Sequence, residues 1–226
     1  MKSKGIIIKS IDYQESSKIV YLYTPNGKCS IKAIGALNPK KGLSGFTTTA
    51  NIVSFVASDS DFPKLEEYNL ELSSIKFSNS IEEIEAIRII IELIGYIPDD
   101  INHNSTYQFI EKTINDLSKG DIRKVISIFL IKMLYIFGVA PQLKSCIICG
   151  SKSSLIGFSI TDGGATCSTC KSANNTGLLS IWNEYYYDKK DISEYSEYDY
   201  KLLLSKINKY YLAHVHINLK LDLLIN

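Results

Sequence analysis

Residues 18–33 decide the first part of the fold, and they read KIVYLYTPNGKCSIKA. Two short runs rich in Ile, Val and Tyr flank Pro-Asn-Gly at 25–27, which predicts a β-hairpin whose Gly27 takes a positive φ. In the second run, apolar and polar residues alternate as in a half-buried strand. One face of that strand belongs to the core and the other is basic: Cys29, Ile31 and Ala33 against Lys28, Ser30 and Lys32.

Further strands flank this hairpin on both sides. These runs are rich in β-branched and aromatic residues and are separated by turn signals. The predicted strands cover residues 5–13, 18–24, 28–37, 51–58 and 65–75. Because a small sheet removes its exposed edges by closing, we expect a five-stranded barrel domain over residues 1–79.

The hydrophobic period changes from that of a strand to that of a helix at Ser80. Ser80 and Glu83 form a capping-box pattern, and isoleucines then recur at helical spacing up to Pro98. Further helices are predicted over residues 105–117, 121–137, 198–211 and 212–224, with a solvated connection over the Tyr-rich residues 185–200. The chain is therefore expected to be mixed α+β, with a helical domain over residues 80–226.

Four of the five cysteines stand in two pairs with metal-ligand spacing, Cys146-x-x-Cys149 and Cys167-x-x-Cys170. Two residues between cysteines let one turn direct both thiolates at one ion, and two such turns form the tetrahedral sulfur cage that zinc prefers. Because four thiolates leave no open coordination position, we expect one structural Zn²⁺ in a module at residues 145–178, with a hairpin between the two turns. A pair of redox CxxC motifs or an iron–sulfur cluster is the alternative.

The remaining candidates for chemistry are one cysteine and three histidines. Cys29 has the parity of the barrel core, and His103, His214 and His216 lack suitably spaced partners, so all four are interpreted as structural or surface residues. The sequence contains no Walker A, H-E-x-x-H, G-x-S-x-G or dinucleotide-binding motif. We expect no catalytic residues and no enzymatic activity.

Length and composition suit one or two globular domains, with 226 residues, 45% of them hydrophobic, and 25 Lys and Arg against 24 Asp and Glu. The longest apolar runs, residues 87–97 and 125–137, are interrupted by charges and are shorter than the roughly 18 residues of a membrane span. No signal-peptide core follows the N-terminal lysines. Cysteines spaced for metal indicate a reducing compartment, so we expect a cytoplasmic protein with no membrane partner.

Positive charge is concentrated in the predicted barrel. Residues 1–58 hold eight lysines and two acidic residues, and Tyr13, Tyr21 and Tyr23 lie among the lysines. In a groove for single-stranded nucleic acid, lysines follow the phosphates and aromatic rings stack on bases. A solvated surface with tyrosines packed in the core would show the same pattern, so the pattern alone leaves both interpretations open.

Several blocks in a fixed order resemble the RecO family of bacterial DNA repair proteins, which are recombination mediators. They are GIIIKSIDYQES at residues 5–16, KIVYLYTPxG at 18–27, KAIGA at 32–36 with Lys40 and Lys41 after it, and the cysteine quartet inside a helical domain. In this order, the blocks are spread over most of the length of the chain. Family members often carry several arginines and lysines after the KAIGA block, whereas residues 1–80 of this chain contain no arginine, so lysine, a poorer bidentate phosphate ligand, would have to make the contacts.

The resemblance implies an N-terminal OB-fold barrel, a helical domain with a four-cysteine zinc module, and binding to single-stranded and double-stranded DNA. It also implies a nucleoid-associated protein that anneals complementary strands and helps to load RecA recombinase on strands coated with single-stranded-DNA-binding protein. The expected partners are the C-terminal tail of that protein and RecR, with RecA indirectly. The expected DNA contacts are Lys9, Lys18, Lys28, Lys32, Lys40 and Lys41, and the expected zinc ligands are Cys146, Cys149, Cys167 and Cys170. Candidate cations for the partner tail are Arg88, Arg123, Lys124, Lys132 and Lys206.

Two other functions use similar parts. A zinc-ribbon OB-fold protein that acts on RNA or in transcription is the first alternative, because a fold alone does not determine function. A metal-dependent nuclease with a carboxylate site at Asp59 and Asp61, or at Asp99 and Asp100, is the second. Adjacent acids in loops are usually solvated, which favours the two binding functions over the enzyme.

Overall fold

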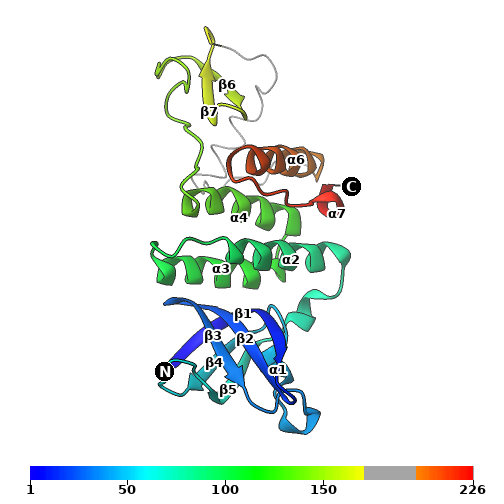
Figure 1. Ribbon diagram of the computed structural model, residues 1–226. Coiled ribbons are helices and arrows are strands. Elements are labelled where there is room, and N and C mark those ends of the chain that lie inside the picture. Colours follow the sequence, from blue (N-terminus) through cyan, green and yellow to red (C-terminus); the bar gives the residue numbers. More distant parts are fainter. Residues whose placement is uncertain (171–196, 226) are drawn as a thin grey trace. The chain divides into compact units, whose positions relative to one another are not determined.

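The computed structural model describes residues 1–170 and 197–225 of the chain. These residues form two compact units, Met1–Lys119 and Gly120–Asn226. An antiparallel sheet followed by helices confirms the mixed α+β class (Figure 1). The expected domain limits, residues 1–79, 80–226 and 145–178, stay predictions; by their contacts, the two helices that follow the sheet group with it in the first unit.

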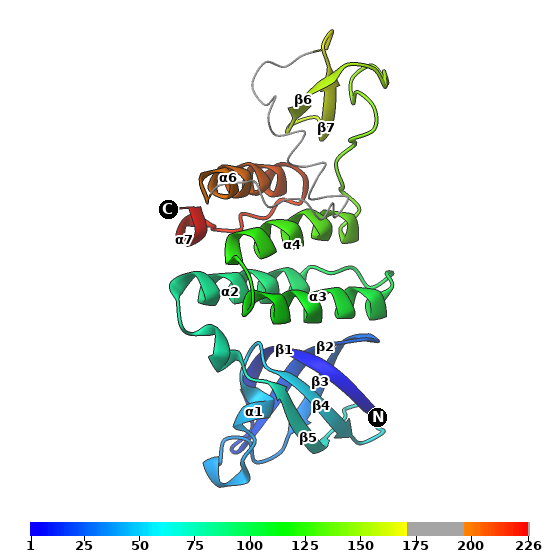
Figure 2. The same ribbon diagram turned by 180° about the vertical axis from the view of Figure 1, so that it is seen from behind.

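The first unit contains a five-stranded antiparallel sheet in the order β3-β2-β1-β4-β5. The strands are β1 (Lys2–Tyr13), β2 (Ser17–Thr24), β3 (Gly27–Ala33), β4 (Ile52–Ala57) and β5 (Leu65–Leu72). A bridge between Lys32 and Lys64 joins β3 to the start of β5, so the sheet curls toward closure. Figure 2 shows the strands wrapped around one another, and the predicted OB-like barrel is confirmed.

The barrel core follows from the period-two alternation of its strands. Buried apolar side chains from β1 to β4 form one cluster, which also includes Phe46 of the short helix α1 (Ser44–Thr47) between β3 and β4. Cys29 packs against this cluster, as its parity predicts. The 3₁₀ turn Pro39–Lys41 leads into α1 and exposes Lys40 and Lys41.

The hairpin at residues 25–27 has the predicted geometry, with Gly27 at φ 103° and the Thr24 hydroxyl donating to the Gly27 carbonyl at 2.8 Å.

Two predicted strands are shorter than expected. β3 ends at Ala33 because residues 35–38 form a turn, in which the Asn38 N–H donates to the Gly35 carbonyl at 3.0 Å. β5 ends at Leu72, and Ser74–Phe77 form a 3₁₀ turn instead.

Two helices, α2 (Ile81–Gly95) and α3 (His103–Leu117), pack against the barrel within the same unit (Figures 1 and 2). The predicted cap is confirmed: the Ser80 hydroxyl accepts from the Glu83 N–H at 3.1 Å. Asn102 caps α3 through the Ser105 N–H at 3.0 Å. These caps determine where each helix begins on the barrel.

The second unit pairs α4 (Ile122–Ile136) with α6 (Glu197–His214), and the buried Tyr211 hydroxyl donates to the Leu130 carbonyl at 2.7 Å. A two-stranded hairpin, β6 (Leu155–Ser159) and β7 (Gly164–Cys167), confirms the hairpin expected between the cysteine turns.

The prediction of one helix over residues 212–224 is wrong. His216 and Lys220 have positive φ, which an α-helix excludes, and only α7 (Asp222–Ile225) is helical there. Most of the Tyr-rich stretch 185–200 lies outside the described residues. In the described ranges, 1–170 and 197–225, each helix is too short or too polar to cross a bilayer.

Candidate nucleic-acid interface and metal centre

Lysine and tyrosine side chains share the outer face of β1, β2 and β3. Lys9 pairs with Tyr21 across β1 and β2, and Ile11, Ile19 and Lys32 form the next row. Residues paired across strands, and residues two apart along a strand, share one face of a sheet, which places Tyr13 on this face as well. We call Lys9, Tyr13, Tyr21 and Lys32 the lysine–tyrosine face.

Each lysine of this face lies over a tyrosine ring. The Lys9 Nζ is 4.8 Å from the centroid of the Tyr21 ring, and the Lys32 Nζ is 4.7 Å from that of Tyr13. Lys32 also donates to the Gln14 side chain at 3.1 Å. An exposed cation–π contact is worth about 0.5–1 kcal/mol, so either lysine can exchange its ring for a phosphate at small cost.

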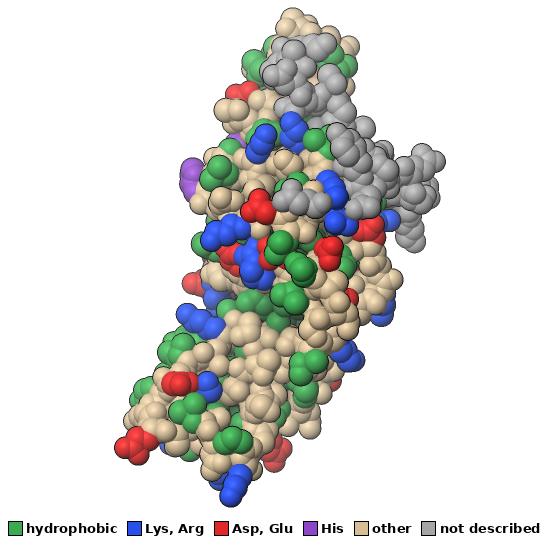
Figure 3. Space-filling model, turned by 90° about the vertical axis from the view of Figure 1, so that its right-hand side faces the viewer, with side chains coloured by type: hydrophobic (Ala, Val, Ile, Leu, Met, Phe, Trp, Pro, Cys, Tyr) green, Lys and Arg blue, Asp and Glu red, His purple; other side chains and the backbone are tan. Residues whose placement is uncertain are grey.

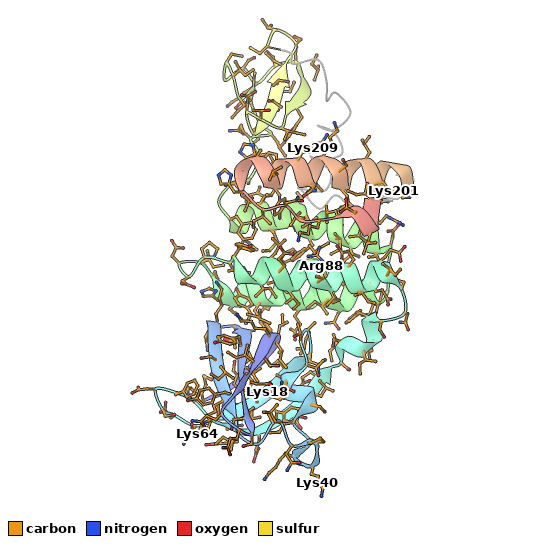
Figure 4. The ribbon with its side chains drawn as sticks, turned by 45° about the vertical axis from the view of Figure 1, so that its right-hand side comes forward. Lys18, Lys40, Lys64, Arg88, Lys201 and Lys209 are labelled. Carbon is orange, nitrogen blue, oxygen red and sulfur yellow. The ribbon has the colours of Figure 1, made fainter. Side chains whose placement is uncertain are left out.

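The other four lysines expected to bind DNA lie outside this group of residues, although Lys28, which pairs with Tyr23, shares its side of the sheet. Lys18 pairs with the fully buried Ala33, which puts it on the opposite side of the sheet, and its Nζ binds Asp12 at 2.7 Å. Lys28 donates to the carbonyls of Gly95 and Ile97 at the end of α2. Lys40 projects from the loop at the end of the barrel remote from α2 and α3 (Figure 4), with Lys41 next to it. Whether any of the six binds DNA stays a prediction.

Tyr23, counted among the possible base-stacking rings, is fully buried. Its hydroxyl is 3.1 Å from the His103 Nδ1, and its ring packs against those of His103 and Tyr107 from α3. Burial raises the pKa of Tyr23 to about 12. Of the three tyrosines, this one therefore joins helix to barrel, and the interpretation as a core tyrosine applies to it.

Two residues near the face were not singled out from the sequence. Phe62 packs edge-on to Tyr13 with ring centroids 6.1 Å apart, and Lys64 lies beside Lys32 in the bridge that closes the barrel. Both come from the loop before β5, about 50 residues from Tyr13 of β1 in the case of Phe62 and about 30 residues from Lys32 of β3 in the case of Lys64. No local period marks them, because barrel closure brings them there.

Charge elsewhere on the barrel is mixed. In the face shown in Figure 3, basic and acidic side chains alternate over the lower part of the molecule, which is the barrel. Of the eight lysines in residues 1–58, Lys9 and Lys32 belong to the lysine–tyrosine face, Lys18 lies on the other side of the sheet, and Lys40 and Lys41 are in a loop.

Two grooves border α2 within the first unit. One, of about 540 Å³, lies between the lysine–tyrosine face and α2. The other, of about 330 Å³, has an apolar lining that includes Phe77, Ile84 and Ile87, together with Arg88. Arg88 is held by carboxylates of its own helix, Glu85 at 2.7 Å and Glu92. Of the cations considered for a partner tail, Arg88 is the one that lines this groove.

The second unit brings the four predicted ligand cysteines together. The sulfur atoms of Cys146, Cys149, Cys167 and Cys170 all lie within 4.8 Å of one another, and among the described residues this is the one cluster of His, Cys, Asp and Glu placed to share a metal ion. The Cys149 and Cys167 sulfurs are 3.7 Å apart. A disulfide requires about 2.05 Å, whereas a tetrahedron with metal–sulfur bonds of about 2.3 Å has edges of about 3.8 Å.

The pKa shifts of three of these thiols also fit a bound dication. A hydrogen bond from the Cys149 backbone lowers the pKa of the Cys146 thiol to about 6, and one from the Cys170 backbone lowers the pKa of Cys167. Hydrogen bonding with Cys149 raises the pKa of Cys170 to about 12, because a further thiolate beside the first ones is unfavourable. A metal ion removes that penalty, so the donor set fits a divalent metal with four thiolate ligands.

The backbone around the cluster is shaped for ligation. Gly150 has φ 74° directly after the second ligand, and its N–H donates to the Cys146 carbonyl at 2.8 Å. The Ile147 N–H donates to the Ala165 carbonyl of β7 at 2.8 Å, which ties the first turn to the hairpin carrying the second.

The hairpin is in turn attached to α6. The His214 ring lies against Tyr210 with centroids 4.3 Å apart, and its Nε2 is 2.6 Å from the Ile160 carbonyl. Tyr210 also packs against Phe158 and donates to the Val139 carbonyl at 3.0 Å. His214 and His103 thus make structural contacts, in agreement with the interpretation of the histidines.

Two family models and several relatives show which known proteins the chain resembles. The family model described as "Recombination protein O N terminal" matches residues 1–72, and "Recombination protein O C terminal" matches residues 79–181. A DNA repair protein RecO of Halalkalibacterium halodurans is 29% identical over 174 residues, covering 75% of this chain and 68% of that protein. One from Bacillus mycoides is 30% identical over 171 residues, covering 74% and 69%. One from Prosthecochloris aestuarii is 30% identical over 157 residues, covering 66% and 60%.

Proposed function

Because the chain belongs to the RecO family of DNA repair proteins, we propose that it is a non-enzymatic recombination mediator in the cytoplasm, associated with the nucleoid. It binds single-stranded and double-stranded DNA, anneals complementary strands, and helps RecA to load on strands coated with single-stranded-DNA-binding protein. No covalent bond is made or broken. Binding energy holds two strands, or a strand and its coating protein, at high local concentration.

The lysine–tyrosine face carries this proposal. Two cations and two aromatic rings alternate on one face of β1 to β3, and each cation–π pair can open to offer a charge to a phosphate and a ring to a base. Lys28, Lys40, Lys41, Phe62 and Lys64 extend the contact along the barrel. Lys18 contributes less, since it is paired with Asp12 on the other side of the sheet.

The cysteine cluster holds one structural Zn²⁺ in this proposal. Zinc supplies no reaction chemistry here, because four thiolates fill its coordination shell. Its part is to join the turns at residues 146–149 and 167–170, and through β6 and β7 to support the contacts with α6.

Protein partners complete the proposed role. In this proposal the acidic, hydrophobic tail of single-stranded-DNA-binding protein binds the groove of about 330 Å³, where apolar side chains lie beside Arg88, and a tail carboxylate replaces Glu85 or Glu92 as the partner of Arg88. RecR is the second partner, on the strength of family membership.

The experiment is annealing of complementary oligonucleotides coated with the cognate single-strand-binding protein, followed by fluorescence without nucleotide at several salt concentrations. Annealing should accelerate, and DNA affinity should fall as salt rises. Replacing Lys9 or Lys32 with Gln should lower the slope of log affinity against log salt by up to about one unit for each lost phosphate contact.

Lys18→Gln is the matched control, since it removes the same charge from the opposite side of the sheet. No annealing by a folded, metal-loaded protein, together with tighter binding to RNA than to DNA, would favour the RNA or transcription function instead. Mg²⁺-dependent loss of labelled DNA would favour a nuclease.

A further inference from the structure

The groove of about 540 Å³ beside the lysine–tyrosine face has the size of a ligand pocket, for which about 300–1,000 Å³ is usual. Its lining is mainly apolar and comes from β1, β2, β3 and α2, all within the first unit. Its lining includes Lys9, Tyr21, Lys28, Cys29, Ser30, Glu92 and Gly95. Two of these, Lys9 and Tyr21, also belong to the lysine–tyrosine face.

We propose that this groove, the base pocket, receives one unstacked base of a single strand bound on the lysine–tyrosine face. The inference rests on the proposed DNA-binding function and deepens it, because it assigns the single-stranded form of the substrate to a particular cavity.

The lining suits a flat, uncharged ligand that has hydrogen-bonding groups along its edge. The Tyr21 ring offers a surface for stacking, and the apolar side chains around it exclude water. Ser30 offers a hydroxyl, and Glu92, which also binds Arg88, offers a carboxylate; together they can pair with the donors and acceptors on a base edge. The edges of nucleic-acid bases carry both hydrogen-bond donors and hydrogen-bond acceptors.

Charge around the pocket separates the base from its phosphates. Lys9 supplies a cation for a phosphate beside the base, Lys28 supplies a second when it leaves the Gly95 and Ile97 carbonyls, and Glu92 contributes negative charge within the lining. A nucleotide matches this pattern, because its base is neutral and its backbone is anionic. An acidic peptide would bring its carboxylates toward Glu92.

Cys29 keeps part of the lining apolar. Burial raises the pKa of its thiol to about 11, so the side chain stays neutral near pH 7 and acts as a small hydrophobic group. Its pairing with Leu22 across β2 and β3 fixes it at the junction between the barrel core and the pocket.

A base pocket would make the protein prefer single strands. A base in a duplex must first leave its partner and its stacked neighbours, which costs a few kcal/mol, whereas a base in a single strand is already available. Duplex DNA could still bind the lysines through its phosphates.

Gly95→Leu tests the proposal, because Gly95 lines the pocket and the substitution adds a bulky side chain to that lining. A Cβ at Gly95 would meet no atom within 4 Å, so a larger side chain can be accommodated, and a non-glycine residue also favours the helix. Gly95→Ala is the matched control, since it gives the same helical benefit but leaves the pocket open. Each variant is titrated with an oligothymidylate, a duplex of equal length, an abasic oligomer of equal charge and an acidic, hydrophobic peptide.

Gly95→Leu should weaken binding of the oligothymidylate at least about fivefold relative to Gly95→Ala, as loss of one stacked base implies, and should leave the duplex and the abasic oligomer unchanged. Equal oligothymidylate affinity of the two variants would overturn the proposal. So would a loss restricted to an acidic, hydrophobic peptide, which would make a protein tail the occupant. Failure of the unmodified protein to bind any DNA would instead reject the proposed function itself.

Discussion

Tyr23 shows how one hydroxyl group joins two elements of the first unit. The ring lies on β2, yet its hydroxyl meets the His103 Nδ1 of α3 at 3.1 Å. Tyr21 has the same residue type two positions earlier but contacts Lys9 at the surface. Neighbouring tyrosines on one strand face thus have different functions, because α3 covers only one of them.

Replacing Tyr23 with Phe should lower the free energy of unfolding by about 1 kcal/mol, because it removes a partly buried hydrogen bond. Urea denaturation at pH 7 measures the change. Tyr21→Phe is the control and should have no comparable effect on stability, since its ring stays in place.

The same substitution makes a prediction about alkaline pH. Burial raises the pKa of Tyr23 to about 12 from an ordinary value of 10.0. The unfolded state therefore loses its proton first, and the stabilisation from Tyr23 is complete below pH 10 and is lost as the pH rises toward 12. The stability difference between the unmodified protein and Tyr23→Phe should shrink over this interval. A stability difference between the two proteins that stayed constant from pH 8 to pH 12 would contradict this prediction.

At the scale of the element, caps determine where α2 begins. Ser80→Ala should destabilise the protein by about 1 kcal/mol, because the Glu83 N–H would lose its acceptor. Thermal unfolding measures this loss. Ser105→Ala makes the same chemical change in the first turn of α3, whose cap comes from Asn102, and should be close to neutral.

The hairpin β6–β7 depends on an element distant in sequence. His214→Ala removes the contact of Nε2 with the Ile160 carbonyl and the packing on Tyr210. It should speed metal release to a chelator several-fold, because the hairpin would open more often. His216→Ala, at an exposed position two residues later, is the control. An unchanged release rate in His214→Ala would mean that the hairpin holds the cysteine turns without help from α6.

For the whole molecule, the two compact units predict separable effects of metal loss. Cys146→Ser should abolish metal binding and lower the thermal stability of the second unit, while single-strand binding by the first unit is retained. Metal content by mass spectrometry, calorimetry and DNA titration test this. If DNA binding fell while both thermal transitions survived, the cysteine module would itself contact DNA.

Much of the architecture could be predicted from local patterns. The 25–27 turn, the cap at Ser80 and the metal-type cysteine spacing each depend on residues close together in the chain, whose chemistry acts over one turn or one strand pair. The prediction of a helix over residues 212–224 was wrong because the local sequence pattern did not decide the conformation there. Residues 215–221 have a helix-compatible composition, but the return of the chain from α6 to α7 requires positive φ at His216 and Lys220.

The sequence by itself determined the mixed α+β class, the order of barrel and helices, the identity of the four clustered cysteines and the resemblance to the RecO family. Only the tertiary structure decided which lysines share a face, that Tyr23 is buried, that Phe62 and Lys64 lie beside the face, and where the groove of about 540 Å³ is. The physical reason is that parity and capping act between near neighbours, whereas barrel closure and helix packing bring together residues tens of positions apart.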